Sequence, residues 1–118
     1  MKNFRQFIIW NRGIELVIKA YELTRQLPKE EMYGLSSQIK RAAVSIPSNI
    51  AEGCSRDSER DFKRFLEISL GSSFELETQL IIAEKLKFID SLNITEYLKG
   101  LHIEQRQINT LISRIKEN

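Results

Sequence analysis

The 118-residue chain is long enough for one domain of ordinary size and for one hydrophobic core. Charged residues make up 29% of it, hydrophobic residues 42%, and the formal net charge is +2, a composition typical of folded soluble proteins rather than disordered ones. Two prolines and five glycines offer few turns, which argues against a many-stranded sandwich or barrel.

The first predicted helix runs from about Phe4 to Leu27 and ends before Pro28, because proline disfavours the helical conformation in the residue that precedes it. Its expected core stripe, taken from the helical spacing, is Phe7, Trp10, Ile14, Val17, Tyr21 and Thr24. The apolar residues outside that stripe are Ile8, Ile9, Leu16 and Leu23. A single core needs a stripe only about 100° wide, so the surplus predicts a second buried surface on this helix.

The second predicted helix has Ser36 or Ser37 as its N-cap and Gly53 at its end. Its apolar stripe is Leu35, Ile39, Ala42, Ala43, Ile46 and Ile50. Pro47 lies inside this helix, where it removes one backbone hydrogen bond and crowds the carbonyl four residues earlier. A kink is favoured over a break, because the apolar period continues to Ile50.

The third predicted helix runs from Ser58 to Leu86 and begins at a capping box formed by Ser58 and Asp61. Its apolar face is Phe62, Phe65, Leu66, Ser69, Ser73, Leu76, Leu80, Ala83 and Leu86. The fourth begins at a cap formed by Asn93 and Glu96, and its face is Leu98, Leu101, Gln105, Ile108, Leu111, Ile112 and Ile115. Because the connections are short, the sequence predicts one all-α domain over residues 1–118, an antiparallel up-down-up-down four-helix bundle with a proline-kinked second helix.

The single cysteine, Cys54, and the single histidine, His102, exclude several kinds of site. One chain can build no internal disulfide, thiolate metal cluster or two-histidine zinc site from them. No Glu-x-x-His motif, acid–base pair or phosphate-binding loop is recognisable either. We therefore expect a protein that is not an enzyme and that uses no metal and no cofactor. No apolar run has the length of a membrane span or signal peptide, which predicts a cytoplasmic protein without membrane contact.

Two segments resemble a known protein family. Residues 38–53 read QIKRAAVSIPSNIAEG, and residues 61–80 read DFKRFLEISLGSSFELETQL. With the long first helix, they resemble the small bacterial four-helix-bundle proteins named for open reading frames in 23S ribosomal RNA intervening sequences. The resemblance covers nearly the whole chain. Ser69 stands where the family stretch has alanine, and Cys54-Ser55 replaces a commoner small or glycine pair; both changes exchange small residues and leave the expected fold unchanged.

The resemblance also implies partners. The family is similar to the accessory variability protein of diversity-generating retroelements, which forms a pentameric barrel of four-helix bundles, binds nucleic acid and contacts a reverse transcriptase. By this resemblance we expect a homo-oligomer, specifically a pentamer, with RNA or DNA and a reverse-transcriptase-like protein as partners. The number of five subunits comes from the resemblance alone, and most family members have no established biochemical role.

Basic residues gather at one end of the predicted bundle. Arg56, Arg60, Lys63 and Arg64 recur with helical spacing on the third helix. The same end holds the start of the first helix and the end of the fourth, which add Lys2, Arg5, Arg12, Arg114 and Lys116. The five acidic residues expected there are Glu52, Asp57, Glu59, Asp61 and Glu117. An excess of four positive charges suits phosphate contacts; a solvated face with intrahelical ion pairs explains the same pattern.

The candidate nucleic-acid-binding residues are Arg12, Lys40, Arg41, Arg56, Arg60, Lys63 and Arg64. Lys40 and Arg41 of the second helix either extend the basic surface or pack their aliphatic stems over a subunit contact. The candidate oligomer-interface residues are Ile9 and Leu16 from the apolar surplus, and a seam of small residues formed by Ala42, Ala43, Ser69, Ser72 and Ser73. The rival hypothesis is a protein-interaction scaffold without affinity for nucleic acid.

Overall fold

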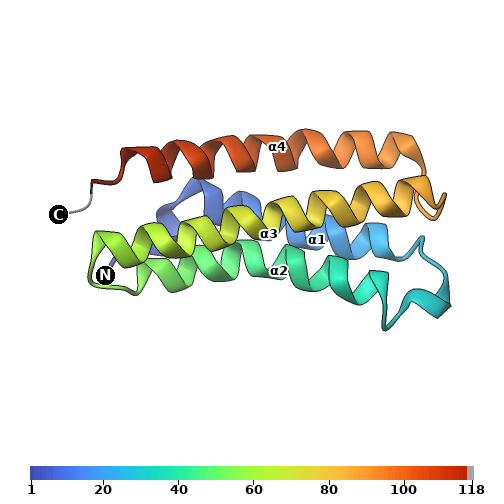
Figure 1. Cartoon of the computed structure of the whole chain (residues 1–118), viewed down its shortest axis with the longest axis horizontal. Helices are drawn as coiled ribbons and strands as arrows, with labels where there is room; N and C mark the ends of the chain where they lie inside the picture. The colour runs from blue at the N-terminus through green and yellow to red at the C-terminus, as the bar shows by residue number, and fades with distance from the viewer. Residues whose placement is uncertain (117–118) are drawn as a thin grey trace.

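The computed structural model describes residues 1–116, which form four α-helices and two short 3-10 turns. The helices are α1 (Ile8–Thr24), α2 (Leu35–Cys54), α3 (Glu59–Lys85) and α4 (Ser91–Arg114); the turns are η1 (Phe4–Gln6) and η2 (Lys29–Glu31). Figure 1 shows consecutive helices running in opposite directions, so the start of the chain, the α2–α3 turn and the end of α4 share one end of the bundle. The all-α, four-helix prediction is confirmed.

The starts of α3 and α4 are set by side-chain oxygens. Ser58 caps α3 as predicted, because its Oγ accepts a hydrogen bond from the N–H of Asp61 at 3.1 Å. α4 begins earlier than expected: Asp90 is its N-cap and accepts from the N–H of Asn93 at 2.8 Å. The predicted cap at Asn93 is therefore wrong, since Asn93 lies in the first turn of the helix and donates to the cap.

α2 starts differently from the prediction and continues through its proline. Gly34 is the N-cap, and the N–H of Leu35 donates to the carboxylate of Glu31 at 3.1 Å, so a serine cap at Ser36 or Ser37 is wrong. Pro47 lies within one unbroken helix, which excludes a break. Its buried ring packs on α1, where a Cβ built on Gly13 would lie 3.1 Å from the Cβ of Pro47.

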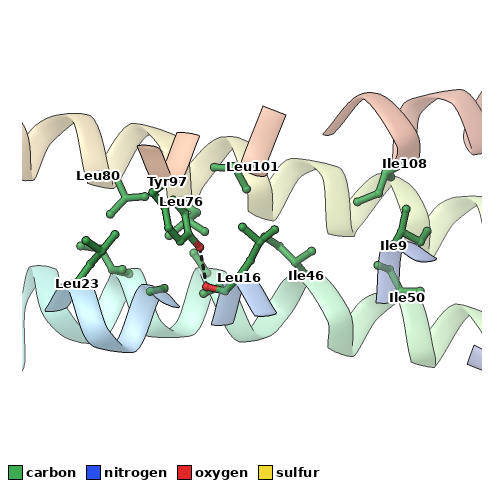
Figure 2. Close-up of a cluster of buried hydrophobic side chains, with 14 of the residues drawn as sticks. Ile9, Leu16, Leu23, Ile46, Ile50, Leu76, Leu80, Tyr97, Leu101 and Ile108 are labelled. Carbon is green, nitrogen blue, oxygen red and sulfur yellow. Dashed lines mark hydrogen bonds between the residues drawn. The ribbon is translucent and has the colours of Figure 1, made fainter. Parts of the chain in front are cut away.

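The core draws on all four helices (Figure 2). Its labelled members in that view are Ile9, Leu16, Leu23, Ile46, Ile50, Leu76, Leu80, Tyr97, Leu101 and Ile108. Tyr97 is buried with its ring among these side chains, and its hydroxyl donates to the backbone carbonyl of Leu16 at 2.7 Å. This bond satisfies the buried hydroxyl and ties α4 to α1 across the core.

The buried face of α1 is not the one predicted. Ile9 and Leu16 are each 4% exposed, whereas Ile14 and Tyr21 of the expected core stripe are exposed. The residues that α1 buries are Ile9, Gly13, Leu16, Ala20, Leu23 and Thr24. Ile9, Leu16 and Leu23 of the predicted surplus therefore belong to the core face, whereas Ile8 is exposed. The second apolar surface of α1 lies along Ile14, Ile18 and Tyr21.

The two glycines of the α2–α3 pair predict opposite effects of alanine. A Cβ at Gly53 would lie 2.9 Å from the Cβ of Phe65, so Gly53→Ala should force the helices apart and lower the free energy of unfolding. Nothing lies within 4 Å of a Cβ at Gly71, so Gly71→Ala should raise it by about 1 kcal/mol through helix propensity. Urea denaturation measures both changes. A Gly53→Ala variant as stable as the wild type would contradict the tight packing of the turn.

Candidate nucleic-acid interface

The end of the bundle that holds the α2–α3 turn carries most of the predicted basic residues (Figure 1). Gly53 allows the end of α2 to approach Phe62 and Phe65 of α3 closely. The turn after Cys54 is therefore short; Arg56 lies in it, and Arg60 and Arg64 are exposed on the first turns of α3. Glu117, expected among the acidic residues of this end, lies outside the described residues.

Phe65 is a platform for two of these arginines. The guanidinium carbon of Arg56 lies 4.8 Å from the centre of the Phe65 ring, and that of Arg64 lies 5.5 Å from it. Both guanidinium groups therefore lie within cation–π distance of one ring. Arg56 also forms an exposed ion pair with Glu52 at 2.9 Å, which offsets part of its charge.

Lys2 ties the start of the chain to this turn. Its backbone N–H donates to the carbonyl of Cys54 at 2.8 Å, and its ammonium lies 4.6 Å from the centre of the buried Phe62 ring. The same ammonium is paired with Glu59. The charge of Lys2 is therefore engaged in contacts that stabilise the turn. Lys63, also at this end, is half-buried and makes contacts of its own.

Arg60 and Arg64 keep the most available positive charge. Both are exposed, and among residues 1–116 neither lies within 4.0 Å of a carboxylate oxygen. They line a shallow hollow of about 380 Å³ together with Asp61 and Glu67. The hollow itself is charge-balanced, so an anion would meet these arginines from the solvent side rather than inside a closed pocket.

The structure separates the other predicted cations from this end. Arg12 turns toward α4, where its guanidinium lies 3.8 Å from the carboxylate of Glu104 and donates to Gln107. Lys40 packs its ammonium 5.0 Å from the centre of the Tyr21 ring, and Arg41 is exposed beside it. Arg56 follows Arg41 by fifteen positions along α2 and its turn, roughly 22 Å at 1.5 Å per residue. Sequence spacing therefore joined residues that belong to two different parts of the surface.

The predicted small-residue seam lies inside the subunit. Ala43, Ser69 and Ser73 are fully buried between α2 and α3, and Ala42 and Ser72 are nearly so. Ser69 donates to the carbonyl of Ile46 at 2.9 Å, and the hydroxyls of Ser45 and Ser72 are 2.7 Å apart. These residues are a contact between two helices of one chain, so their predicted place in an oligomer interface is wrong.

Ile9 and Leu16 are corrected in the same way, because a side chain 4% exposed in one subunit has no surface to offer another. The apolar residues that α1 leaves in solvent are Ile8, Ile14, Ile18 and Tyr21, with Val44 of α2 on the surface as well. The sequence pattern indicated two apolar faces on α1, since the residues of both repeat with helical spacing. The pattern did not show which of the two faces is buried in the core.

Cys54 is buried and His102 is exposed. Burial raises the pKa of the Cys54 thiol, and nearby Lys2 only partly opposes this, so the thiol stays protonated and unreactive. His102 is exposed and its Nε2 lies 3.0 Å from Glu77 Oε2, while Gln105 donates to the other oxygen of Glu77. These hydrogen bonds hold the pKa of Glu77 below its usual value despite the opposing effect of burial.

In the part of the chain that the structure describes, no three His, Cys, Asp or Glu side chains are grouped so as to hold a metal ion. No helix there has the length and apolarity needed to cross a membrane. Sequence reasoning missed two residues of interest, Phe65 as an arginine platform and Glu104 as a buried carboxylate. Glu104 could have been found, because it follows Tyr97 and Leu101 at helical spacing on the buried face of α4.

Comparison with known proteins identifies a matching family and a crystal structure with a similar fold. The family model described as 23S rRNA-intervening sequence protein matches residues 5–110. A crystal structure of a protein of unknown function from the S23 ribosomal protein family of Bacteroides thetaiotaomicron is similar, with a TM-score of 0.83 and 22% identity over 89% of this chain and 98% of that one. At this identity the likeness shows the fold. No curated protein matches the chain.

The corrected faces of α1 predict different fates for two neighbouring substitutions. Leu16→Glu places a carboxylate in the core and should cost roughly 3–5 kcal/mol, enough to unfold many small domains. Ile18→Glu makes the same change at a side chain that is 56% exposed and should leave the bundle folded. Circular dichroism during thermal unfolding distinguishes them. A folded Leu16→Glu variant with an unchanged melting temperature would overturn this assignment of the core.

Proposed function

The chain belongs to the 23S rRNA-intervening sequence protein family, and we propose that it is a non-catalytic, oligomeric protein that binds nucleic acid, above all RNA, through the basic end of its bundle. The observation that carries this proposal is the pair of exposed arginines, Arg60 and Arg64, beside the α2–α3 turn. They have no carboxylate partner within residues 1–116, and the guanidinium of Arg64 shares the Phe65 ring with that of Arg56.

The charge of this end supports the proposal. Its basic residues without Arg12 are Lys2, Arg5, Arg56, Arg60, Lys63, Arg64, Arg114 and Lys116, and its described acidic residues are Glu52, Asp57, Glu59 and Asp61. Eight positive charges against four negative ones give a local excess in a chain whose total charge is only +2. Neutralising phosphates releases bound counterions, so such an end favours a polyanion without any sequence-specific contact.

The core serines support a non-catalytic protein. Ser69 and Ser73 donate to the carbonyls of Ile46 and Leu70, and Ser72 pairs with Ser45. Their hydroxyls are therefore engaged in packing α2 against α3, and none of them points to a base that could activate it. Binding, rather than chemistry, is the use that this surface supports.

We also propose that the protein is a homo-oligomer, with the pentamer as the expected form. The exposed stripe of Ile14, Ile18 and Tyr21 on α1 replaces Ile9 and Leu16 as its contact surface. A contiguous apolar face of this kind is typical of surfaces that are covered in an assembly. In a ring, this face would meet a different face of the neighbouring subunit, and repetition would place the basic ends around one rim.

The double variant Arg60→Gln, Arg64→Gln tests the nucleic-acid surface. Filter binding to a structured RNA over a salt series should show weaker binding and a logarithmic salt slope reduced by up to about two units. Thermal stability should stay nearly unchanged, because both side chains are exposed. The matched control is Arg25→Gln, Lys29→Gln, which removes two exposed charges at the opposite end.

Two results would contradict this proposal. Equal loss of binding in both double variants would show general charge attraction without a site. No binding by the wild type even at low salt would favour the rival function, a scaffold for a protein partner such as the reverse-transcriptase-like protein that the sequence resemblance implies.

Size-exclusion chromatography with light scattering tests the assembly. The wild type should have several times the subunit mass of 13.8 kDa, and Ile18→Glu should lower this mass while the subunit stays folded. Leu92→Glu is the control, since it charges an exposed leucine at the start of α4, away from the stripe. A wild-type mass near 13.8 kDa at micromolar concentration would contradict the proposed oligomer. The mass of a dimer or a tetramer would contradict only the pentamer.

A further inference from the structure

A carboxylate without hydrogen bonds lies in the middle of this bundle. Glu104 of α4 is 0% exposed, and neither of its carboxylate oxygens has a hydrogen-bond partner among residues 1–116. An ionised carboxylate in such a place has lost its hydration and gained little in exchange. The protonated acid avoids most of that cost, so the position favours the neutral form.

The surroundings of Glu104 leave it little room. A Cβ on Gly13 of α1 would lie 3.3 Å from Glu104 Oε2 and 3.1 Å from the Cβ of Pro47 of α2. Three helices thus meet at Glu104, where even a methyl group on Gly13 would crowd the carboxylate and the proline ring. The nearest cation is Arg12, whose guanidinium nitrogen lies 3.8 Å from Glu104 Oε1, beyond ordinary hydrogen-bond distance.

Polar links hold α4 to α1 on either side of a partly open boundary. At one, the Tyr97 hydroxyl donates to the carbonyl of Leu16; at the other, Arg12 bridges to Gln107 and Glu104. A cleft of about 500 Å³ opens between the two helices, with Leu16, Leu23 and Tyr97 in its lining. The α1–α4 contact is therefore the one at which this cleft lies, whereas α2 and α3 pack through fully buried small residues.

We propose that Glu104 is a proton-controlled latch between α4 and α1. When the carboxyl group is protonated, α4 closes against Gly13 and Pro47 as the structure shows. When it ionises, the carboxylate must reach water to regain its hydration, and this movement draws α4 away from α1. A rise in pH thus loosens this one boundary of the bundle.

The electrostatic environment of Glu104 determines the pH at which its carboxyl group ionises. Burial raises the pKa of Glu104 to about 8, and Arg12 only partly opposes this. Burial raises the pKa of Tyr97, the other titratable group of α4 at this place, and the Glu104 charge adds to this effect. α2 contributes Pro47 there, and the titratable Glu77 of α3 is engaged with His102 and Gln105 of α4.

The sign of the pH effect follows from linkage. Glu104 has a pKa near 4.5 in the unfolded chain and about 8 in the folded one, so folding takes up a proton between these values. The protonated Glu104 therefore makes its full contribution to the free energy of unfolding below pH 4.5, the pKa in the unfolded chain. That contribution is lost progressively as the pH rises toward the pKa in the folded chain. Above pH 8 the folded chain holds a buried charge.

The variant Glu104→Gln keeps the shape of the side chain and removes the titration. The unfolding equilibrium constant of the wild type, divided by that of Glu104→Gln, should rise at least tenfold between pH 5.5 and 7.5, measured by urea denaturation. Taking the ratio cancels the titration of other groups. The control is Glu96→Gln, on the exposed side of α4, whose ratio to the wild type should stay nearly constant.

Hydrogen exchange locates the movement. At pH 8.5, amides of residues 91–114 should exchange faster in the wild type than in Glu104→Gln, whereas those of residues 59–85 should match. Equal changes in all four helices would overturn the latch and leave only a general loss of stability. So would a ratio of unfolding constants that does not vary with pH.

Two measurements keep the proposal testable if Glu104→Gln does not fold. Carbon NMR of the wild type follows the Glu104 carboxyl directly; titration near pH 8 supports the latch, and titration below pH 5 overturns it. Arg12→Gln removes the opposing cation, so the carboxyl should titrate at higher pH than in the wild type. A downward shift, or none, would show that Arg12 does not act on Glu104.

Discussion

The close packing of α2 against α3 is the constraint on which the rest of the structure depends. Ala43, Ser69 and Ser73 leave no large side chain between the helices, and Gly53 extends this approach to their common turn. Serines in a dry contact need partners, and Ser69 finds one in the carbonyl of Ile46. Because the turn is tight, the arginines that follow it are fixed on the outside of α3 rather than spread along a loop.

Sequence periodicity predicted this helix pair well and α1 poorly, for a physical reason. α2 and α3 each have one apolar face, so the pattern identifies the buried side. α1 has two, and its true core face contains Gly13 and Ala20, which add little hydrophobicity, although Gly13 allows Pro47 to pack closely. The bulkier stripe through Ile14 and Tyr21 therefore dominated the pattern although it lies in solvent. The spacing of hydrophobic residues shows where apolar surface lies along a helix. It does not show how closely a neighbouring helix approaches.

The candidate site shows a similar limit. Spacing along α3 predicted that Arg60 and Arg64 share a face, and both line one hollow, because that is local geometry. Arg56 lies in the turn before this helix. Spacing could not predict that Arg12 would turn inward, since this depends on a carboxylate ninety-two residues further along the chain. Charge counts along a sequence treat every cation as available. Packing decides which of them reach the surface with their charge intact.

Some buried polar groups of the core have hydrogen-bond partners and others have none. The parts of the fold around them therefore differ in stability. Tyr97 and Ser69 each donate to a backbone carbonyl, so their burial costs little and fixes the helices in register. Glu104 has no such partner within residues 1–116. The α2–α3 pair therefore forms the firm half of the bundle and presents the basic turn, whereas the α1–α4 boundary depends on the protonation of one carboxyl group. A fold of this kind can yield at one boundary while the basic end stays assembled.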